Sequence, residues 1–432
     1  MHVNDAENAW DNSGTPWTRE GPQLVVAVRP AGEACWAARA KAATGSPKQR
    51  PDHHSLEAHG APPELAIVPA STLRPAYVPA FLLLLLIPAV AACEKRSDAP
   101  PPAPTPAPTA PRARAFDPAQ LAVFAPLPSA IERPDNALTP DKVELGKMLW
   151  FDTRLSSGQD VSCNSCHDVT KNGADVAARS IGTKKQPTPR NAPTIFNAAA
   201  EAVQGWDARA TLLEELIVPH AAEPSVMGVD EKRLVATVTS IPAYAAAFNK
   251  SFPDAKGAVT GEVVSMALGA YARKLLTPGR WDRFLSGDQG ALTDDEKAGL
   301  GAFMDASCTT CHAGRYVGAS QTQKLGVASP WTPAPADVGR FEVTRQEVDR
   351  FVFKVPTLRN ITKTGPYLHD GSATSLTDLT KLMARHQLEK ELTDAQARLI
   401  VTFLGALDGE PPKDLVTRPH LPASGPKTPK PN

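Results

Sequence analysis

Two copies of the pattern Cys-x-x-Cys-His constrain this chain more than any other feature. They are Cys163-Asn-Ser-Cys166-His167 and Cys308-Thr-Thr-Cys311-His312. The pattern is typical of covalent haem attachment, in which both thiols join the vinyl groups and the histidine supplies an axial nitrogen to the iron. A lone Cys-x-x-Cys could equally be a redox dithiol or half of a zinc site, but the adjoining histidine, present twice, favours haem. We therefore predict two covalently bound haem c groups.

The N-terminal part of the chain has the features of an export signal. Residues 78–92 form an apolar stretch interrupted by two prolines, too short and too broken for a comfortable membrane span and typical of a secretory signal. Val90-Ala91-Ala92-Cys93 follows the pattern of a bacterial lipobox, so we expect a periplasmic protein that is lipid-anchored at Cys93. Residues 1–72 precede this signal. We interpret them as an extension that is mis-annotated or disordered, and a cytoplasmic extension before a signal anchor is the alternative.

Composition and helix signals divide the rest of the chain. The net charge is zero, which argues against a nucleic-acid partner. Capping residues Thr139, Thr293 and Thr393 each precede a helical apolar pattern, and no long alternating pattern indicates a large sheet. We expect an all-α fold of two tandem cytochrome c-like haem domains with long loops and a small β-ribbon within 339–353. The predicted segments are the extension 1–72, the signal peptide 73–93, the Pro/Ala-rich linker 94–115, the N-terminal haem domain 116–278, the C-terminal haem domain 279–412 and a disordered tail 413–432.

Further sequence blocks surround the two haem motifs in a fixed order. Together they make the chain resemble the bacterial dihaem cytochrome c peroxidases, a family that includes the dihaem enzymes that mature methylamine dehydrogenase. The resemblance covers about residues 140–410. The blocks are Leu145-Gly146-Lys147, Phe151-Asp152-Thr153-Arg154-Leu155-Ser156, Arg190-Asn191-Ala192-Pro193-Thr194, Trp206-Asp207-Ala208-Arg209-Ala210, Phe284-Leu285-Ser286-Gly287-Asp288, Phe353-Lys354-Val355-Pro356-Thr357-Leu358-Arg359-Asn360 and Pro366-Tyr367-Leu368-His369-Asp370-Gly371.

The resemblance implies unequal roles for the two haem sites. The C-terminal haem would be an electron store with His312 and Met383 as axial ligands, because a thioether favours ferrous iron. Taken alone, Met383 in an apolar helical segment would be a packing residue. Trp206 matches the tryptophan that carries electrons between the haems in the family. The resemblance also implies a Ca²⁺ ion between the domains, bound by Asn191, Thr364 and Pro366.

Two positions depart from the pattern of the family. Thr183 stands where many relatives have a histidine that blocks the N-terminal haem, so we expect the far face of that haem to be open or water-bound. Leu216 and Val226 stand where the family has its glutamine and its acid/base glutamate, and neither can move a proton. His220 and Glu223 are the candidates to replace them, and His220 could alternatively be an iron ligand. The alternative for both is a solvent-exposed polar loop.

The function that the resemblance implies is a peroxidase reaction. We expect reduction of hydrogen peroxide to water with electrons from a small cytochrome c or a cupredoxin. One alternative is a dihaem oxidase of a partner protein or a small molecule, and another is a non-catalytic electron carrier or redox sensor. The resemblance also allows a homodimer, and the only expected contact with the membrane is the lipid anchor.

Overall fold

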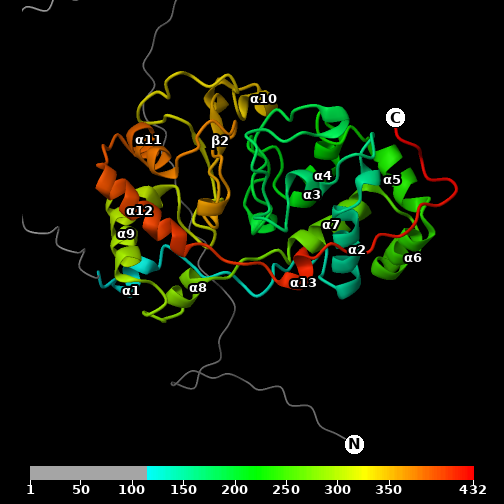
Figure 1. The fold of residues 1–432 in the computed structure, drawn as a ribbon, viewed down its shortest axis with the longest axis horizontal. Coiled ribbons are helices and arrows are strands. Elements are labelled where there is room, and N and C mark those ends of the chain that lie inside the picture. Colours follow the sequence, from blue (N-terminus) through cyan, green and yellow to red (C-terminus); the bar gives the residue numbers. More distant parts are fainter. Residues whose placement is uncertain (1–113) are drawn as a thin grey trace, which may run out of the picture. The chain divides into compact units, whose positions relative to one another are not determined.

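The computed structural model describes residues 114–432, and most of its regular structure is helical (Figure 1). The predictions about the extension, the signal peptide, the anchor at Cys93 and nearly all of the linker lie outside the described residues. Within residues 114–432 the only sheet is an antiparallel pair of strands, β1 Thr322–Lys324 and β2 Val352–Lys354. The expected mostly helical fold is thus confirmed. The ribbon pairs the end of the predicted 339–353 region with an earlier strand that we did not predict.

The predicted capping residues begin helices where the sequence placed them. The Thr139 hydroxyl accepts a hydrogen bond from the Lys142 backbone N–H at the start of α2, with Pro140 in the first turn. Thr293 and Thr393 each form a capping box with the residue three positions later, at the starts of α9 and α12. These caps satisfy backbone N–H groups that would otherwise lack partners.

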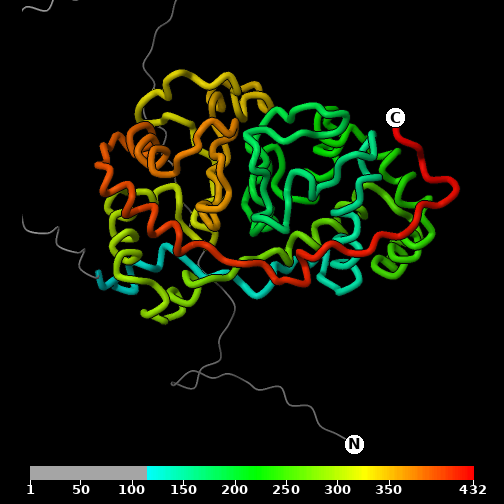
Figure 2. Tube along the Cα trace, in the orientation of Figure 1, coloured from blue at the N-terminus to red at the C-terminus, as the bar shows by residue number. Residues whose placement is uncertain are grey.

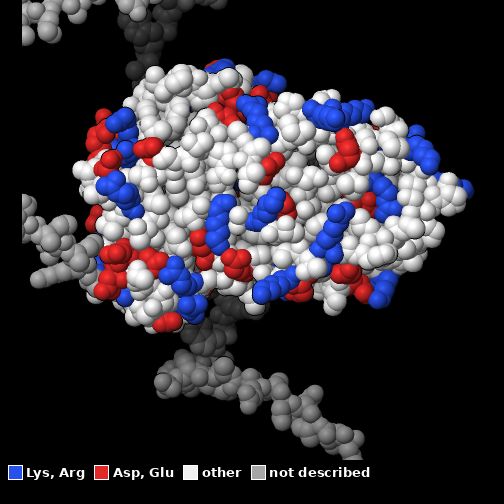
Figure 3. Space-filling model, in the orientation of Figure 1, with Lys and Arg blue, Asp and Glu red and all other residues white. Residues whose placement is uncertain are grey.

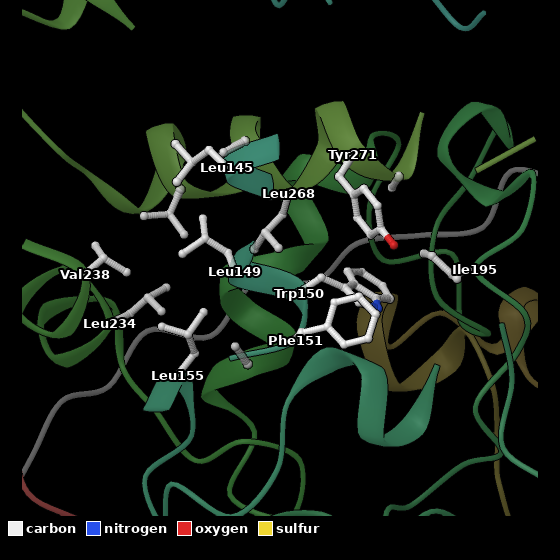
Figure 4. Packing of buried hydrophobic residues seen from close by; sticks show 14 of the residues in the cluster. Leu145, Leu149, Trp150, Phe151, Leu155, Ile195, Leu234, Val238, Leu268 and Tyr271 are labelled. Atoms are coloured by element: carbon white, nitrogen blue, oxygen red, sulfur yellow. The ribbon is translucent and has the colours of Figure 1, made fainter. Parts of the chain in front are cut away.

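Five helices surround the first hydrophobic core, and we call this group of helices the first cluster. At the crossing of two of them, a Cβ added to Gly146 would lie 2.0 Å from the carbonyl oxygen of Ala267, so this close approach requires glycine. Leu149 from one helix and Leu268 and Tyr271 from the other point into the space between them (Figure 4). The five helices are α2 Pro140–Trp150, α4 Leu213–Ala222, α5 Glu231–Thr239, α6 Pro242–Ser251 and α7 Gly261–Ala272.

The second hydrophobic core is surrounded by four helices, here called the second cluster. Glycine is again required where two helices approach closely: a Cβ added to Gly299 would lie 2.2 Å from the carbonyl oxygen of Leu399. Trp281 and Phe403 meet edge to face in this core with ring centroids 5.3 Å apart. The four helices are α8 Arg280–Leu285, α9 Asp294–Asp305, α11 Leu376–Leu388 and α12 Asp394–Ala406.

Short helices and 3-10 turns complete the described chain. None of the helices in residues 114–432 combines the length and the apolar character that a membrane-spanning segment needs. The short helices are α1 Pro118–Leu121, α3 Cys163–Cys166, α10 Phe341–Thr344 and α13 Lys413–Val416. The 3-10 turns are η1 Thr153–Leu155, η2 Thr183–Lys185, η3 Ala198–Ala200, η4 Pro253–Ala255, η5 Cys308–Thr310, η6 Glu347–Asp349 and η7 Ile361–Lys363.

Both ends of the described chain pack differently from our expectation. The segment after residue 116 was expected in the N-terminal domain, but Phe124 lies in the second core, with its ring 5.1 Å from that of Trp281. Conversely, Leu415 of α13 is buried in the first core, and the Tyr271 hydroxyl donates to its carbonyl at 2.9 Å. Each cluster is therefore completed by a segment from the far end of the chain.

The tail 413–432 is ordered, which corrects the expectation of disorder. It runs along the first cluster (Figure 2). The Gln159 amide donates to the carbonyl of Pro429 at 2.7 Å, and Arg154 donates to the Ser424 hydroxyl at 3.0 Å. Proline has no N–H to donate, but its carbonyl still accepts hydrogen bonds. The proline-rich tail is therefore an extended segment, and side chains beside the first cluster hold it in place.

The distribution of surface charge agrees with the composition. Acidic and basic side chains are interspersed over the face shown in Figure 3, without a large area of one sign. The chain has as many basic as acidic residues, with 46 of each. This face therefore offers no broad positive field of the kind that attracts nucleic acid.

Candidate functional site

The first haem motif lies in a cavity of the first cluster. α3 carries Cys163 and Cys166, and His167 follows at its C-terminal cap. The His167 Nδ1–H donates to the carbonyl of Pro193 at 2.8 Å, which fixes the ring and leaves Nε2 with a free lone pair. Burial lowers the pKa of His167 to about 4, so the imidazole is neutral at pH 7, as a metal ligand must be.

The second haem motif lies in a separate cavity of the second cluster. Cys308 begins η5, and Cys311 and His312 follow directly after it. His312 Nδ1 lies 3.3 Å from the carbonyl oxygen of Val317, and burial lowers the pKa of His312 to about 4. Met383, on α11, lines the same cavity. The structure therefore brings the predicted thioether on α11 and the imidazole of His312, which follows η5, to one cavity from segments far apart in sequence.

Both cavities fit a covalently bound haem. In each, two thiols and one neutral imidazole of a haem motif converge, and leucine, isoleucine and valine side chains supply much of the wall. Burial raises the pKa of Cys163 and of Cys308 to about 12, so both thiols are uncharged in these apolar surroundings. A thioether bond to a haem would equally leave these sulfur atoms without charge.

The two candidate acid/base residues line the first cavity. His220 is on α4, and its Nδ1 lies 3.6 Å from Glu223 Oε1. Arg209 donates to the same oxygen at 2.7 Å. Although burial opposes ionisation, the hydrogen bond from His220 and the charges of His220 and Arg209 lower the pKa of Glu223. Leu216 and Val226, at the positions of the missing acid/base pair, line the same cavity.

Thr183 does not line the first cavity and is bonded elsewhere. It is buried, its hydroxyl donates to Asp160 Oδ1 at 2.8 Å, and it accepts from the Gly158 N–H at 3.1 Å. Its own N–H donates to the carbonyl of Val226 at 2.8 Å. These bonds tie Thr183 to Val226 in the wall of the cavity.

Trp206 lies between the two cavities and lines both. Its indole Nε1–H donates to the carbonyl of Asn191 at 2.9 Å, and its carbonyl accepts from the Lys354 N–H at 2.8 Å. Its ring faces His369 edge to face, with centroids 6.4 Å apart. One hydrogen bond thus orients the indole, and a second holds the backbone of Trp206 against β2.

The three residues of the predicted calcium site line the second cavity together. They are Asn191, Thr364 and Pro366. The Asn191 Nδ2 donates to the carbonyls of Ala177 and Ala178, which leaves Oδ1 as the acceptor. No cluster of three or more histidine, cysteine, aspartate or glutamate side chains suitable for a metal occurs in residues 114–432. A cation here would therefore depend on amide and carbonyl oxygens, which suit calcium.

Sequence reasoning missed two groups at the junction of the cavities. Lys354 lines both cavities, and its Nζ pairs with the carboxylate of Glu201, which lines the second. Both side chains are buried. Lys354 belongs to a quoted family block, but nothing in that block predicts a partner for its charge. Glu201 lies in an alanine-rich stretch without any motif, so no local signal indicated it.

Comparison with known proteins identifies the group to which these cavities belong. The sequence profile described as di-haem cytochrome c peroxidase matches residues 140–290. The chain is 41% identical over 302 residues to a cytochrome c551 peroxidase of Nitrosomonas europaea, covering 69% of this chain and 89% of that protein. It is 38% identical over 315 residues to a cytochrome c551 peroxidase of Pseudomonas aeruginosa, covering 72% and 90%. A solved MauG-like protein associated with microbial copper homeostasis superposes with a TM-score of 0.57 at 25% identity, covering 68% of this chain and 95% of that one.

Proposed function

The chain belongs to the di-haem cytochrome c peroxidase family and is a peroxidase with two haem c groups. We propose the following division of the reaction among its residues. The first cavity is the site of peroxide reduction, and the second is the site at which electrons enter. One observation carries this proposal: the first cavity unites His167 with His220 and Glu223, whereas the second unites His312 with Met383. In the first cavity an iron ligand thus shares the space with groups that can move a proton, whereas in the second it shares the space with a thioether that can act as a second iron ligand.

The second site receives electrons from a small cytochrome c or a cupredoxin. When bound, the haems supply the electron chemistry, because each iron stores one electron and reduction of one peroxide molecule to water takes two. Met383 and His312 hold the second haem, and the thioether raises its potential. Trp206, which lines both cavities, gives the electrons a path between the two sites. We assign residues 116–278 and 279–412 as the two haem domains; the segment around Phe124 packs on the second domain, and α13, which follows the second domain, packs on the first.

Proton transfer falls to His220, with Glu223 as its partner. Peroxide reduction needs a group that takes a proton from one oxygen and delivers it to the other. The His220 side chain is 45% exposed, so it can exchange protons with solvent while its ring borders the cavity. Glu223 is held by Arg209 and remains ionised at neutral pH, so it can stabilise the protonated form of His220.

The far face of the first haem is open or water-bound in the oxidised enzyme. Three hydrogen bonds of Thr183 support this part of the proposal. Thr183 stands at the position of the blocking histidine, and these bonds already engage its hydroxyl and its backbone N–H. Electronic and EPR spectra of the purified oxidised protein test it. We expect high-spin iron at one site. Low-spin iron at both would instead favour His220 as an axial ligand.

Three further assignments rest on the resemblance and the sequence. Calcium binds Asn191 together with the carbonyl oxygens of Thr364 and Pro366 at the edge of the second cavity. The protein is periplasmic and lipid-anchored at Cys93 after removal of the signal peptide 73–93. The resemblance is also compatible with a homodimer.

The test is steady-state peroxide consumption with reduced cytochrome c as donor. We expect His220→Ala to lower turnover by about 100-fold, the smaller end of the range for a positioned acid/base group. Glu223→Gln should lower it less. His420→Ala, which removes an exposed histidine that lines neither cavity, is the matched control and should leave turnover unchanged. A wild-type turnover no better than that of free haem would overturn the proposal and favour the oxidase alternative.

A further inference from the structure

A buried ion pair lies where the two cavities meet. Lys354 is on β2, and its ammonium group contacts the carboxylate of Glu201, which follows η3. The two side chains are only 5% and 2% exposed. Removing two charges from water costs several kcal/mol for each ion, and replacing such pairs by apolar residues is often neutral or stabilising. Stability alone therefore does not account for a charged pair at this point.

The position of Lys354 relates it to both cavities at once. It lines the first and the second, whereas Glu201 lines only the second. Its backbone N–H donates to the carbonyl of Trp206 at 2.8 Å, which fixes the strand beside the indole. Arg190, another cation that lines the first cavity, is held by Asp337 at 2.6 Å. Lys354 is thus a fixed cation whose field reaches both cavities.

A fixed cation changes the energy of a nearby redox centre. The reduced form of a haem iron carries one charge less than the oxidised form, so a neighbouring positive charge favours reduction and raises the midpoint potential. The effect is larger in a low-dielectric interior than in water. Glu201 offsets part of this effect at the second cavity but does not line the first. The net influence of the pair should therefore be greatest at the first site.

We propose that Lys354 is an electrostatic positioning residue that raises the midpoint potential of the first haem site, with Glu201 as its buried counterion. The inference rests on the proposed placement of one haem in each cavity. Beyond that placement, the inference gives Lys354 a role. Its charge makes electron transfer into the peroxide site more favourable, although the side chain does not contact peroxide.

The experiment is a redox titration of the complete holoprotein, with each site followed by its own absorbance change. Lys354→Gln removes the charge and keeps a hydrogen-bond donor for Glu201. We expect the potential of the first site to fall. The fall should occur whether or not Glu201 then takes up a proton, because Glu201 does not line that cavity. Lys354→Arg keeps the charge and should retain the wild-type potential.

Two further variants complete the test. Arg385→Gln on α11 removes an exposed charge paired with Glu391, which solvent screens, and should shift neither potential. The double variant Lys354→Gln/Glu201→Gln replaces the ion pair by two amides. It should lower the first potential as well, and it serves if the single variant does not take up haem.

The outcomes separate this inference from the proposed function. Mass spectrometry counts the haems on each protein. Fewer than two on the wild type would contradict the placement of the haems. Two haems with an unchanged first potential in Lys354→Gln would overturn the role of Lys354, and so would an equal fall in Lys354→Arg, because that result would indicate a steric effect.

Discussion

The bidentate ion pair between Arg359 and Asp282 should be a main support of the second cluster. Arg359 Nη1 and Nη2 donate to the two carboxylate oxygens at 3.0 and 2.8 Å, and the Arg359 side chain is fully buried. Asp282 also accepts from the backbone N–H groups of Leu127 and Gly279, at 2.7 and 2.8 Å. The pair thus ties together the N-terminal segment, the start of α8 and the strand-to-turn region that borders the second cavity.

We expect Arg359→Met to lower the free energy of unfolding by about 3–5 kcal/mol, because it leaves a buried carboxylate without its cation. Asp282→Asn should cost a similar amount. The double variant should cost less than the sum of the two, by at least about 1 kcal/mol, because the second change removes the group that the first left unpaired. The assay is urea denaturation of the holoprotein, followed by far-UV circular dichroism.

A matched control comes from a similar pair on the surface. Arg385 donates to Glu391 at 2.6 Å, but the two side chains are 53% and 72% exposed. Arg385→Met should change the free energy of unfolding by less than about 1 kcal/mol. A cost of Arg359→Met no larger than this, or strictly additive single variants, would refute the argument from burial.

The same pair has a pH dependence of defined sign. Burial opposes ionisation of Asp282, but the hydrogen bonds and charge of Arg359 outweigh it and lower the pKa of the carboxyl. Its contribution is therefore fully present above the unfolded-state pKa, about 3.9, and is lost as the pH falls through the lower folded-state pKa. The difference in stability between wild type and Arg359→Met should shrink as the pH is lowered from about 7 to about 3. A constant difference would contradict the assignment.

Three further variants test other parts of the structure. Tyr271→Phe removes the donor to the Leu415 carbonyl and should lower the free energy of unfolding by about 1 kcal/mol; an unchanged urea midpoint would mean that this bond does not hold the tail. Met383→Ala should lower the midpoint potential of the second site, measured by redox titration, whereas an unchanged potential would point to a different ligand. Gly146→Ala should destabilise by about 1–3 kcal/mol through overpacking, while Gly405→Ala, within α12 and with nothing within 4 Å of an added Cβ, should not destabilise in the same denaturation assay, because alanine favours a helix over glycine.

The helices and the haem motifs were predictable because their signals are local. The threonine caps, the proline after Thr139 and the Cys-x-x-Cys-His spacing each lie within a few residues of the feature that they specify. The structure bears out these helix starts. The family could likewise be identified, because its blocks are contiguous stretches such as Trp206–Ala210.

The packing of the chain ends was not predictable for the opposite reason. The tail 413–432 has a composition that favours an extended and solvated chain, and nothing within it indicates that Arg154, Gln159 and Tyr271 supply its partners. Its order depends on side chains that lie 144 to 270 residues away along the chain. Phe124 similarly lies, with its neighbours Phe116 and Leu121, against the core of the second cluster, whose other members come from residues 281–407.

By itself, the sequence determined that this protein carries two covalent haems, that it is mostly helical and that it resembles the dihaem peroxidases, because each of these depends on short-range spacing. Only the tertiary structure decided that Met383 lines the cavity of His312, that His220 and Glu223 line that of His167, and that Lys354 and Glu201 form a buried pair between the two. These groups come from helices, turns and a strand distant in sequence. Their proximity follows from how the cores pack, and burial then sets the charge and the pKa of each group.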